Sequence, residues 1–302
     1  MIRFEVKEPE GRLLCDTHPR LRIGKTSLSF GEGPLWDESS QSLLFVDIIQ
    51  SHIWRWSVES GGMELIAEDT GHANGLAFDR SGRLVAAGWS SRSIWRLEVD
   101  GSRTVLASHY QGVRLNTPND LIALKDGNIL FTDSDGGLFI PGMEGADLQR
   151  YLPYSGVYAL LASGELKLLV SDCCFPNGIA LSPDGRRVFV SDTLNAHVRS
   201  FALQPGPSLE SAEVFYEVDG KEPGHADGMV FDREGNLYCT GPGGIHIVSP
   251  SGALIARLLV AEDCTNMAWG GRDMRTLFIT TFHSVLAVDM NVSGLRPGEA
   301  IQ

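Results

Sequence analysis

The sequence has few basic residues and no long apolar run. Its 302 residues include 25 Lys and Arg against 38 Asp and Glu, which gives a formal net charge of −13 at pH 7. Nucleic acids and anionic membranes bind basic surfaces, so this balance argues against either as the main partner. No stretch approaches the roughly 18 apolar residues that would cross a bilayer. The charged first residues also lack the apolar core of a signal peptide, so we expect a cytoplasmic protein.

Cysteine is scarce, and its spacing excludes the usual thiolate sites. The five cysteines include no CxxC pair, which argues against a structural zinc site or a redox pair. Cys173 and Cys174 are adjacent, and a bridge between neighbours would be strained. We therefore expect free thiols in a reducing compartment. A nucleophilic role for this pair has no support, because the sequence places no partner histidine beside it.

Helical patterns are also absent. No segment combines a capping residue with a 3.6-residue period over a helical length. Instead, a unit of apolar segment, tight turn and second apolar segment occurs six times, beginning at Gly31, Ala73, Pro118, Pro176, Ala226 and Thr265. Most turns carry a glycine that permits positive φ, and the flanks are rich in β-branched and aromatic residues. Each copy therefore predicts a β-hairpin.

Six sheet-forming repeats favour one architecture. We expect an all-β, six-bladed β-propeller whose blades pack face to face around a central channel, as a single domain over residues 1–302. The segment Met1–Ser29 precedes the six copies. It is predicted to supply the outermost strand of the last blade, because this closes the ring and removes an exposed edge.

One position at the start of the first strand is polar in all six copies. It holds Glu32, Asn74, Asn119, Asn177, Asp227 and Asn266. Equivalent positions on six inner strands form a ring around one mouth of the channel. A single Asn or Asp there would be explained by side-chain bonds to nearby backbone, but six in register favour a functional ring. Two acids among amides suit a hard divalent cation such as Ca²⁺, or Mg²⁺ or Mn²⁺ if fewer protein oxygens bind.

The stretches around these positions resemble a known family. They are GEGPLWDESSQSLLFVDI, RLNTPNDLIALKDGNILFTD, FPNGIALSPDGRRVFVSDT, HADGMVFDREGNLYCTGPGGI and CTNMAWGGRDMRTLFIT, which together span most of the chain from Gly31 onward. The sequence resembles the SMP-30/gluconolactonase/regucalcin-like family of six-bladed propeller lactonases, and is most similar to its bacterial gluconolactonase branch. Five motifs in the right order make the resemblance specific.

The resemblance implies one divalent metal at one mouth of the channel. Its metal ligands fall on Glu32, Asn119, Asn177 and Asp227, and Asn119 also meets the substrate. Arg114 and Asn116, on the loop before the third inner strand, would hold polar groups of the substrate. Ca²⁺ is the expected metal, while Mg²⁺, Mn²⁺, Zn²⁺ and Fe²⁺ also suit a partly open catalytic site. The stretch 134–137 departs from the Pro-containing sequence of close relatives, which leaves the substrate preference open.

The predicted reaction is the opening of a sugar lactone. The metal would polarise the carbonyl, and Asp227 would act as the general base that activates water. A carboxylate beside the metal is expected to keep a low pKa and to be ionised at neutral pH. Two alternatives remain: a propeller that hydrolyses organophosphates with a similar metal ring, and a non-enzymatic calcium-binding or interaction propeller.

Further polar residues are assigned lesser roles. His225 stands two residues before Asp227 and is a candidate for a contact with the substrate, whereas His283 could face the channel or the surface. Asp47, Asp133 and Asp192 end second strands, and each is expected to cap a turn.

Overall fold

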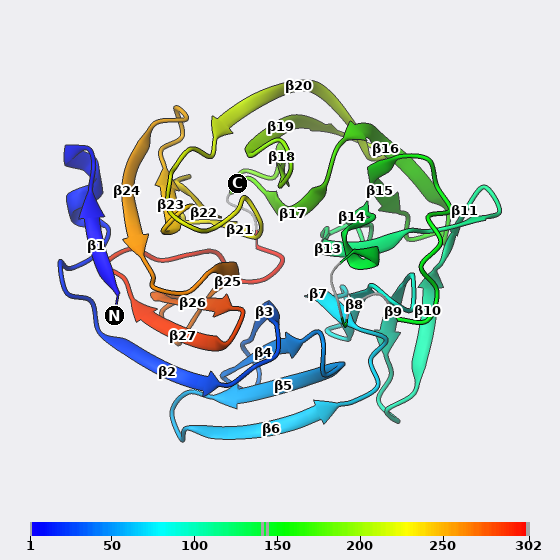
Figure 1. Cartoon of the computed structure of the whole chain (residues 1–302), viewed down its shortest axis with the longest axis horizontal. Helices are drawn as coiled ribbons and strands as arrows, with labels where there is room; N and C mark the ends of the chain where they lie inside the picture. The colour runs from blue at the N-terminus through cyan, green and yellow to red at the C-terminus, as the bar shows by residue number, and fades with distance from the viewer. Residues whose placement is uncertain (1, 140–141, 143–144, 300–302) are drawn as a thin grey trace.

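The computed structural model describes residues 2–139, 142 and 145–299, whose strands form six antiparallel sheets around a central channel (Figure 1). Each sheet is one blade of a β-propeller, which confirms the predicted fold. The innermost strand of each blade lines the channel. These strands are β3 (Gly31–Asp37), β7 (Ala73–Phe78), β13 (Thr117–Ala123), β17 (Pro176–Leu181), β21 (Met229–Phe231) and β25 (Cys264–Gly270).

The remaining strands follow outward in chain order. Blade one adds β4 (Ser42–Asp47), β5 (His52–Ser57) and β6 (Gly62–Ala67), and blade two adds β8 (Leu84–Gly88), β9 (Ser93–Leu97) and β10 (Arg103–Ala107). Blade three adds β14 (Ile129–Ser134), β15 (Ser155–Leu160) and β16 (Leu166–Cys173), and blade four adds β18 (Arg187–Asp192), β19 (His197–Gln204) and β20 (Ser208–Glu217). Blade five adds β22 (Leu237–Gly241), β23 (Gly244–Val248) and β24 (Leu254–Leu259), and blade six adds β26 (Thr276–Thr281) and β27 (Ser284–Asp289).

The N-terminal segment closes the ring. β2 (Leu21–Thr26) pairs antiparallel with β27, with Leu21 opposite Val288, so it forms the outermost strand of blade six as predicted. β1 (Arg3–Val6) pairs with β24 and gives blade five a fifth strand, which the sequence did not predict. One short segment thus fastens the outer edges of two neighbouring blades.

Short elements connect the blades. β11 (His109–Tyr110) and β12 (Val113–Arg114) form a small hairpin before blade three. The helices of the described residues are the 3₁₀ turns η1 (Pro9–Leu13) and η2 (Gly136–Leu138). No helix in this part of the chain has the length and apolar character needed to cross a membrane.

Apolar side chains fill the space between neighbouring sheets. The largest cluster joins blades five, six and one, and it contains Trp36, Tyr238, Trp269 and Phe278. The rings of Trp36 and Phe278 stack with their centroids 5.3 Å apart. Buried aromatic residues contribute large apolar contact areas, so these contacts hold the blades in fixed positions around the channel.

Glycine directly after the ring position lets neighbouring inner strands approach closely. Gly33 has a φ of 53°, and a Cβ there would lie 2.1 Å from the carbonyl oxygen of Asn74 in the next blade. A Cβ at Gly178 would lie 2.3 Å from the carbonyl oxygen of Asp227 in the same way. The absence of a Cβ at these two glycines therefore allows neighbouring inner strands to lie close together at the ring.

Gly33→Ala is expected to destabilise the protein far more than Gly61→Ala. Both glycines have positive φ, which costs a residue with a Cβ about 1–2 kcal/mol. No atom lies within 4 Å of a Cβ at Gly61, whereas Gly33 faces backbone, and such crowding costs about 1–3 kcal/mol more. Thermal unfolding of the two variants measures the difference. Equal melting temperatures would contradict the role given to close strand contact.

Candidate active site

The ring residues lie at irregularities of the inner strands. In β13 the pairing shifts between Pro118 and Leu121, so that Asn119 and Asp120 together face Thr132 of β14. β7 and β17 show the same shift at their ring residues. A β-bulge leaves residues outside the ladder and bends the strand, and bulges are common beside active sites. The bulges explain why residues with poor strand propensity are accommodated at these positions.

Hydroxyl groups on the second strands hold the bulged backbone. Thr132 Oγ1 accepts a hydrogen bond from the Asp120 N–H (3.0 Å) and donates one to the Asn177 carbonyl of the next blade (2.6 Å). Thr240 Oγ1 accepts a hydrogen bond from the Asp227 N–H (2.7 Å). The backbone around the ring is thus fixed by side chains where the ladder is interrupted, which satisfies polar groups that would otherwise be buried without partners.

Acids at the ends of three second strands hold the chain where it enters the inner strands. Each accepts backbone N–H groups from the segment before the inner strand of its own blade: Asp47 from Ser29 and Phe30, Asp133 from Asn116, and Asp192 from Cys174 and Phe175. Asp192 also accepts a bond from the Asn195 amide in the turn that follows it. The predicted role as turn caps therefore describes only part of what these acids do.

Two pairs of ring side chains meet across blade boundaries. Asn266 Nδ2 donates to Glu32 Oε2 over 3.0 Å, although the two residues are 234 positions apart. Asn74 Nδ2 donates to Asn119 Oδ1 over 3.1 Å. All four side chains are buried. The polar residues of separate repeats therefore come together at the channel, as the repeat alignment predicts.

The other two ring residues keep oxygen atoms without protein partners. Asn177 Nδ2 donates to Thr193 Oγ1 of its own blade (3.1 Å), and within the described residues no donor reaches its side-chain oxygen. Asp227 is half-buried. Its carboxylate receives no hydrogen bond from the part of the chain that the structure describes, although its N–H and C=O groups are both bonded. Such oxygens can accept a ligand.

Three carboxyl groups near the ring titrate abnormally. Burial and then the charge of Asp120 raise the pKa of Glu32 to about 8, although hydrogen bonds from Gly33 and Asn266 act in the opposite direction. Burial raises the pKa of Asp120 to about 6. Burial and then the charges of Glu32 and Asp120 raise the pKa of Asp227 well above its usual range. The predicted low pKa of Asp227 therefore requires a compensating positive charge in the ring.

The free oxygens of the ring suit a hard cation. Glu32 Oε2 accepts bonds from the Gly33 N–H (2.6 Å) and from Asn266, which leaves Oε1 available. Together with the free oxygens of Asn177 and Asp227, this makes a set of carboxylate and amide donors of the kind that Ca²⁺ and Mg²⁺ prefer. No group of three or more His, Cys, Asp or Glu residues in the described chain could hold a metal by itself. A cation at this site would therefore need amide oxygens.

Arg114 and Asn116 lie beside the ring strand of blade three, with their side chains already bonded. Arg114 Nη1 donates to Asp147 Oδ2 over 2.9 Å, and the hydroxyl of Tyr151 donates to the same oxygen over 3.0 Å. Asn116 is completely buried, and its amide bonds the backbone of Leu152 from both sides. This geometry gives Asn116 a structural role. The predicted substrate contacts of both residues are untested and stay predictions.

Comparison with known proteins places these features in a family. Residues 30–283 match the family described as the SMP-30/Gluconolactonase/LRE-like region. This chain belongs to that family. A gluconolactonase from Zymomonas mobilis is 28% identical over 93% of this chain and 84% of its own length. A pentonolactonase from Haloferax volcanii is 26% identical over 86% of this chain and 84% of its own length.

A solved structure in this family has the same fold. The chain superposes on a gluconolactonase from Xanthomonas campestris with a TM-score of 0.88 and 28% identity, covering 95% of this chain and 94% of that one. The similarity extends over the whole propeller, so the inner strands that carry the ring belong to the shared fold.

Sequence reasoning missed two acids that shape this family member's site. Asp120 stands where four other blades carry glycine. Its negative charge helps to raise the pKa of Glu32 and that of Asp227. The departure from the glycine pattern was a signal that could have identified it. Asp147, the partner of Arg114, lies in the long connection between β14 and β15, which has no counterpart in the other repeats. No repeat pattern could have located it.

The histidines and cysteines lie outside the ring contacts described above. His225 is exposed, and His283 Nδ1 lies 3.0 Å from the carbonyl oxygen of Leu28 at the junction of the N-terminal segment with blade six. Cys173 is buried, and burial raises the pKa of its thiol to about 12. Such a thiol is not a nucleophile at neutral pH. All five cysteines are free, as expected.

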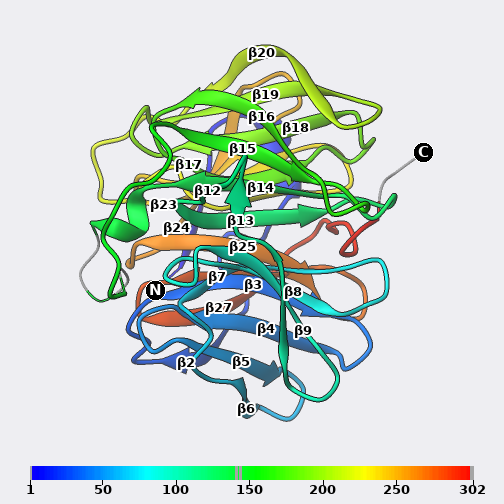
Figure 2. The same cartoon turned by 90° about the vertical axis from the view of Figure 1, so that its right-hand side faces the viewer.

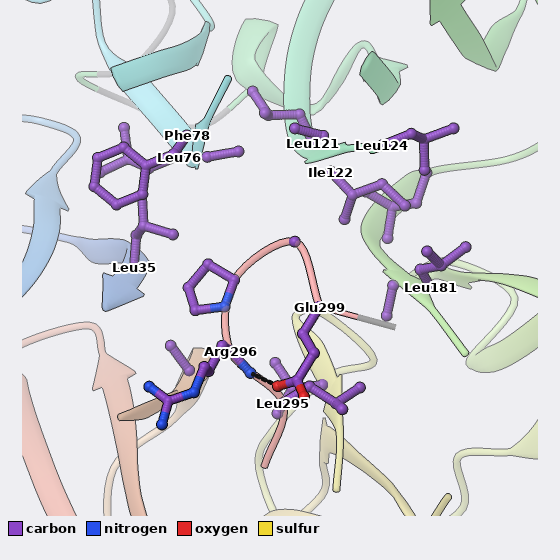
Figure 3. A pocket seen from close by; sticks show the side chains of 18 of the residues that line it. Leu35, Leu76, Phe78, Leu121, Ile122, Leu124, Leu181, Leu295, Arg296 and Glu299 are labelled. Atoms are coloured by element: carbon purple, nitrogen blue, oxygen red, sulfur yellow. Dashed lines mark hydrogen bonds between the residues drawn. The ribbon is translucent and has the colours of Figure 1, made fainter. Parts of the chain in front are cut away.

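A large cavity opens at one mouth of the channel. It has a volume of about 840 Å³, and its walls are apolar side chains of the inner strands, including Leu35, Leu76 and Leu121 (Figure 3). Asp120 and Asn266 are the ring-side residues that reach it. In Figure 2 the two mouths face left and right: η2 lies on the left and the C-terminal segment on the right.

The C-terminal segment partly fills this mouth. Leu295–Glu299 lines the cavity, and Figure 3 shows the bond from the Arg296 N–H to the Glu299 carboxylate. Nη2 of Arg233 donates to both carboxylate oxygens of Glu299, at 2.5 and 2.6 Å, and Arg296 pairs with Glu38 of blade one. The segment is therefore tied to blades five and one.

Ending the chain at Gly294 is expected to uncover the apolar cavity. The truncated protein should increase the fluorescence of the dye ANS several-fold, because ANS binds exposed apolar surface, while circular dichroism shows an intact fold. Arg272→Ala provides a control, since its ion pair with Glu59 lies on the open surface. Unchanged dye binding by the folded, truncated protein would show that the segment does not cover the cavity.

Proposed function

We propose that this protein hydrolyses a sugar lactone with the help of one divalent cation held by Glu32, Asn119, Asn177 and Asp227. The observation that carries the proposal is the group of buried carboxylates and amide oxygens at the channel, whose charges no residue of the ring compensates. Relatives named as lactonases over nearly the whole chain support the same reaction class. Ca²⁺ is the first candidate, because all donors are oxygens.

Some of the ring residues would bind the cation, and one would transfer a proton. A bound divalent cation supplies Lewis acidity, which polarises the carbonyl oxygen and makes a nearby water more acidic. Glu32 and Asn177 would act only as ligands, because each already has one polar group bonded within the protein. Asn119 would serve as a ligand or bond the substrate through its amide, whose Nδ2 is buried without a partner.

Asp227 would take the proton from the attacking water. The water oxygen bonds to the carbonyl carbon, and the C–O bond within the lactone breaks. The leaving oxygen then receives a proton and becomes a hydroxyl group. The free carboxylate of Asp227 suits this role because no protein donor engages it among the described residues. General-base assistance of this kind contributes about 10²–10⁴-fold to the rate.

Arg114 would orient a hydroxylated substrate at the rim. Its guanidinium is partly exposed, and its other nitrogens remain available while Nη1 bonds Asp147. An arginine fork is well suited to bonding two oxygens of one ligand. Asp147 lies against both Arg114 and Arg92, so its single negative charge is shared between two guanidinium groups.

The decisive experiment is metal analysis of the purified protein, followed by assays on metal-free protein with each cation restored. We expect hydrolysis of aldonolactones to vanish on chelation and to return with one divalent cation, Ca²⁺ first. Turnover of a fluorophosphate but of no lactone would replace the reaction with organophosphate hydrolysis. Cation binding without turnover of either substrate would favour a binding propeller, and full lactonase activity without any cation would overturn the metal assignment.

A further inference from the structure

Two polar side chains form the floor between the ring and the large cavity. Asp120 and Asn266 come from blades three and six, which face each other across the channel (Figure 1). Both residues also line the apolar cavity on the other side. They therefore separate a polar compartment from an apolar one, and their contacts determine how the polar compartment is shaped.

The orientation of the Asn266 amide follows from its bonds. Its Oδ1 accepts the N–H of Met267 on its own strand over 2.8 Å. The NH₂ group consequently points toward Glu32 and donates to its Oε2 over 3.0 Å, and the same amide lowers the pKa of the nearby Asp120 carboxyl. An amide nitrogen has two N–H groups, so one side chain can serve both acids.

Glycines of the neighbouring blades leave space for the side chains of Asn266 and Asp120. A Cβ at Gly228 would lie 2.0 Å from Asn266 Oδ1, and a Cβ at Gly75 would lie 2.5 Å from Asp120 Oδ1. The glycines of blades five and two thus make room for the two floor side chains. Asp120 is held further by the N–H groups of Leu121 (2.8 Å) and Ile179 (3.2 Å).

We infer that Asn266 is a positioning residue that clamps Glu32, and that it thereby presents Glu32 to the cation through Oε1. The inference rests on the proposed function, because it assumes that Glu32 is a ligand. Because Oε2 already accepts bonds from Gly33 and Asn266, Oε1 is the oxygen that Glu32 would offer to a cation.

Replacing this amide by an apolar side chain of similar volume tests the clamp without adding charge to the site. Asn266→Leu removes the donors that orient Glu32. Partners that orient metal ligands typically contribute 10–100-fold to affinity, so we expect Ca²⁺ and Mn²⁺ to bind at least about 10–100-fold more weakly. Asn266→Ala also removes the donors, and it should lower the affinity by about 10-fold.

The measurement is isothermal titration of metal-free, full-length protein with CaCl₂ and with MnCl₂. Asn128→Leu is the matched control, because the Asn128 amide also donates to a carboxylate, that of Asp126 (2.7 Å), but at an exposed turn. This variant should bind both cations as the wild type does. Thermal unfolding of each variant establishes that the proteins compared are folded.

The outcomes separate the clamp from the proposed function. Wild-type protein that binds neither cation would end the proposed metal-dependent function. If the wild type binds and both Asn266 variants bind equally well, the clamp is overturned while the function stands. Weakened binding in Asn266→Leu and Asn266→Ala, with Asn128→Leu unchanged, is the result that supports the positioning role.

Discussion

Asp227→Asn is expected to lower kcat for lactone hydrolysis by about 10²–10⁴-fold, which is the usual contribution of a general base. Asparagine keeps the shape of the side chain and one oxygen that can ligate a cation, but it cannot take a proton from water. The measurement is the hydrolysis rate of gluconolactone at saturating substrate and at a cation concentration that fills the variant. The KM should change much less than kcat.

A second Asp→Asn change provides the control. Asp100 lies in an exposed turn of blade two, where it bonds Ser102, and Asp100→Asn should retain wild-type turnover. Metal content measured on the same samples distinguishes a lost base from a lost ligand. Asp227→Asn that turns over within ten-fold of wild type, at equal metal content, would remove Asp227 from the role of base.

Glu32→Gln is expected to weaken cation binding and to stabilise the metal-free protein. Removing one member of a buried charge pair typically costs 2–5 kcal/mol, or roughly 30- to 5,000-fold in affinity. Without the cation, burial raises the pKa of Glu32 to about 8, so the native state holds a proton that the unfolded state releases above its usual pKa of 4.5. Protonated Glu32 thus makes its whole contribution to the free energy of unfolding below about pH 4.5, and this contribution is lost as the pH rises through 8.

These opposite effects make the prediction specific. Titration calorimetry should show weaker binding by Glu32→Gln. Chemical unfolding of the metal-free proteins should show a stability advantage for the variant that grows between about pH 5 and 8. Glu64→Gln is the control, because its carboxylate pairs with Arg55 on the exposed edge of blade one. A variant that binds the cation normally would contradict the assignment of Glu32 as a ligand. A stability advantage over the wild type that is no larger at pH 8 than at pH 5 would contradict the raised pKa of Glu32.

The repeat made the fold and the ring predictable. Hairpin copies with a polar residue at one register led to six blades and to contacts such as that between Glu32 and Asn266, because a closed ring must bring equivalent positions together. The pairing of β1 with β24 was not predicted, because the four residues of β1 carry no repeat signal. Their partner strand is also more than 240 residues away.

Other features depended on exceptions to the pattern or on local geometry. Asp120 replaces a glycine, and its effect on Glu32 arises only from their distance in three dimensions. The ion pair between Arg114 and Asp147 depends on a long connection whose course the sequence does not determine. Whether an acid at the end of a second strand caps its own turn or holds the incoming chain, as Asp133 does, is decided by the path of the backbone.

The contact between Glu32 and Asn266 joins the first blade to the last, and Thr265 also donates to the carbonyl oxygen of Gly31 across the same boundary (2.7 Å). In a chain emerging from the ribosome, the proposed cation site would therefore lack its final shape until blade six has been synthesised. An intermediate with an open ring would lack the bond that Asn266 donates to Glu32. Cation binding could accordingly serve as a reporter of the final step of folding, when the two ends of the polypeptide meet.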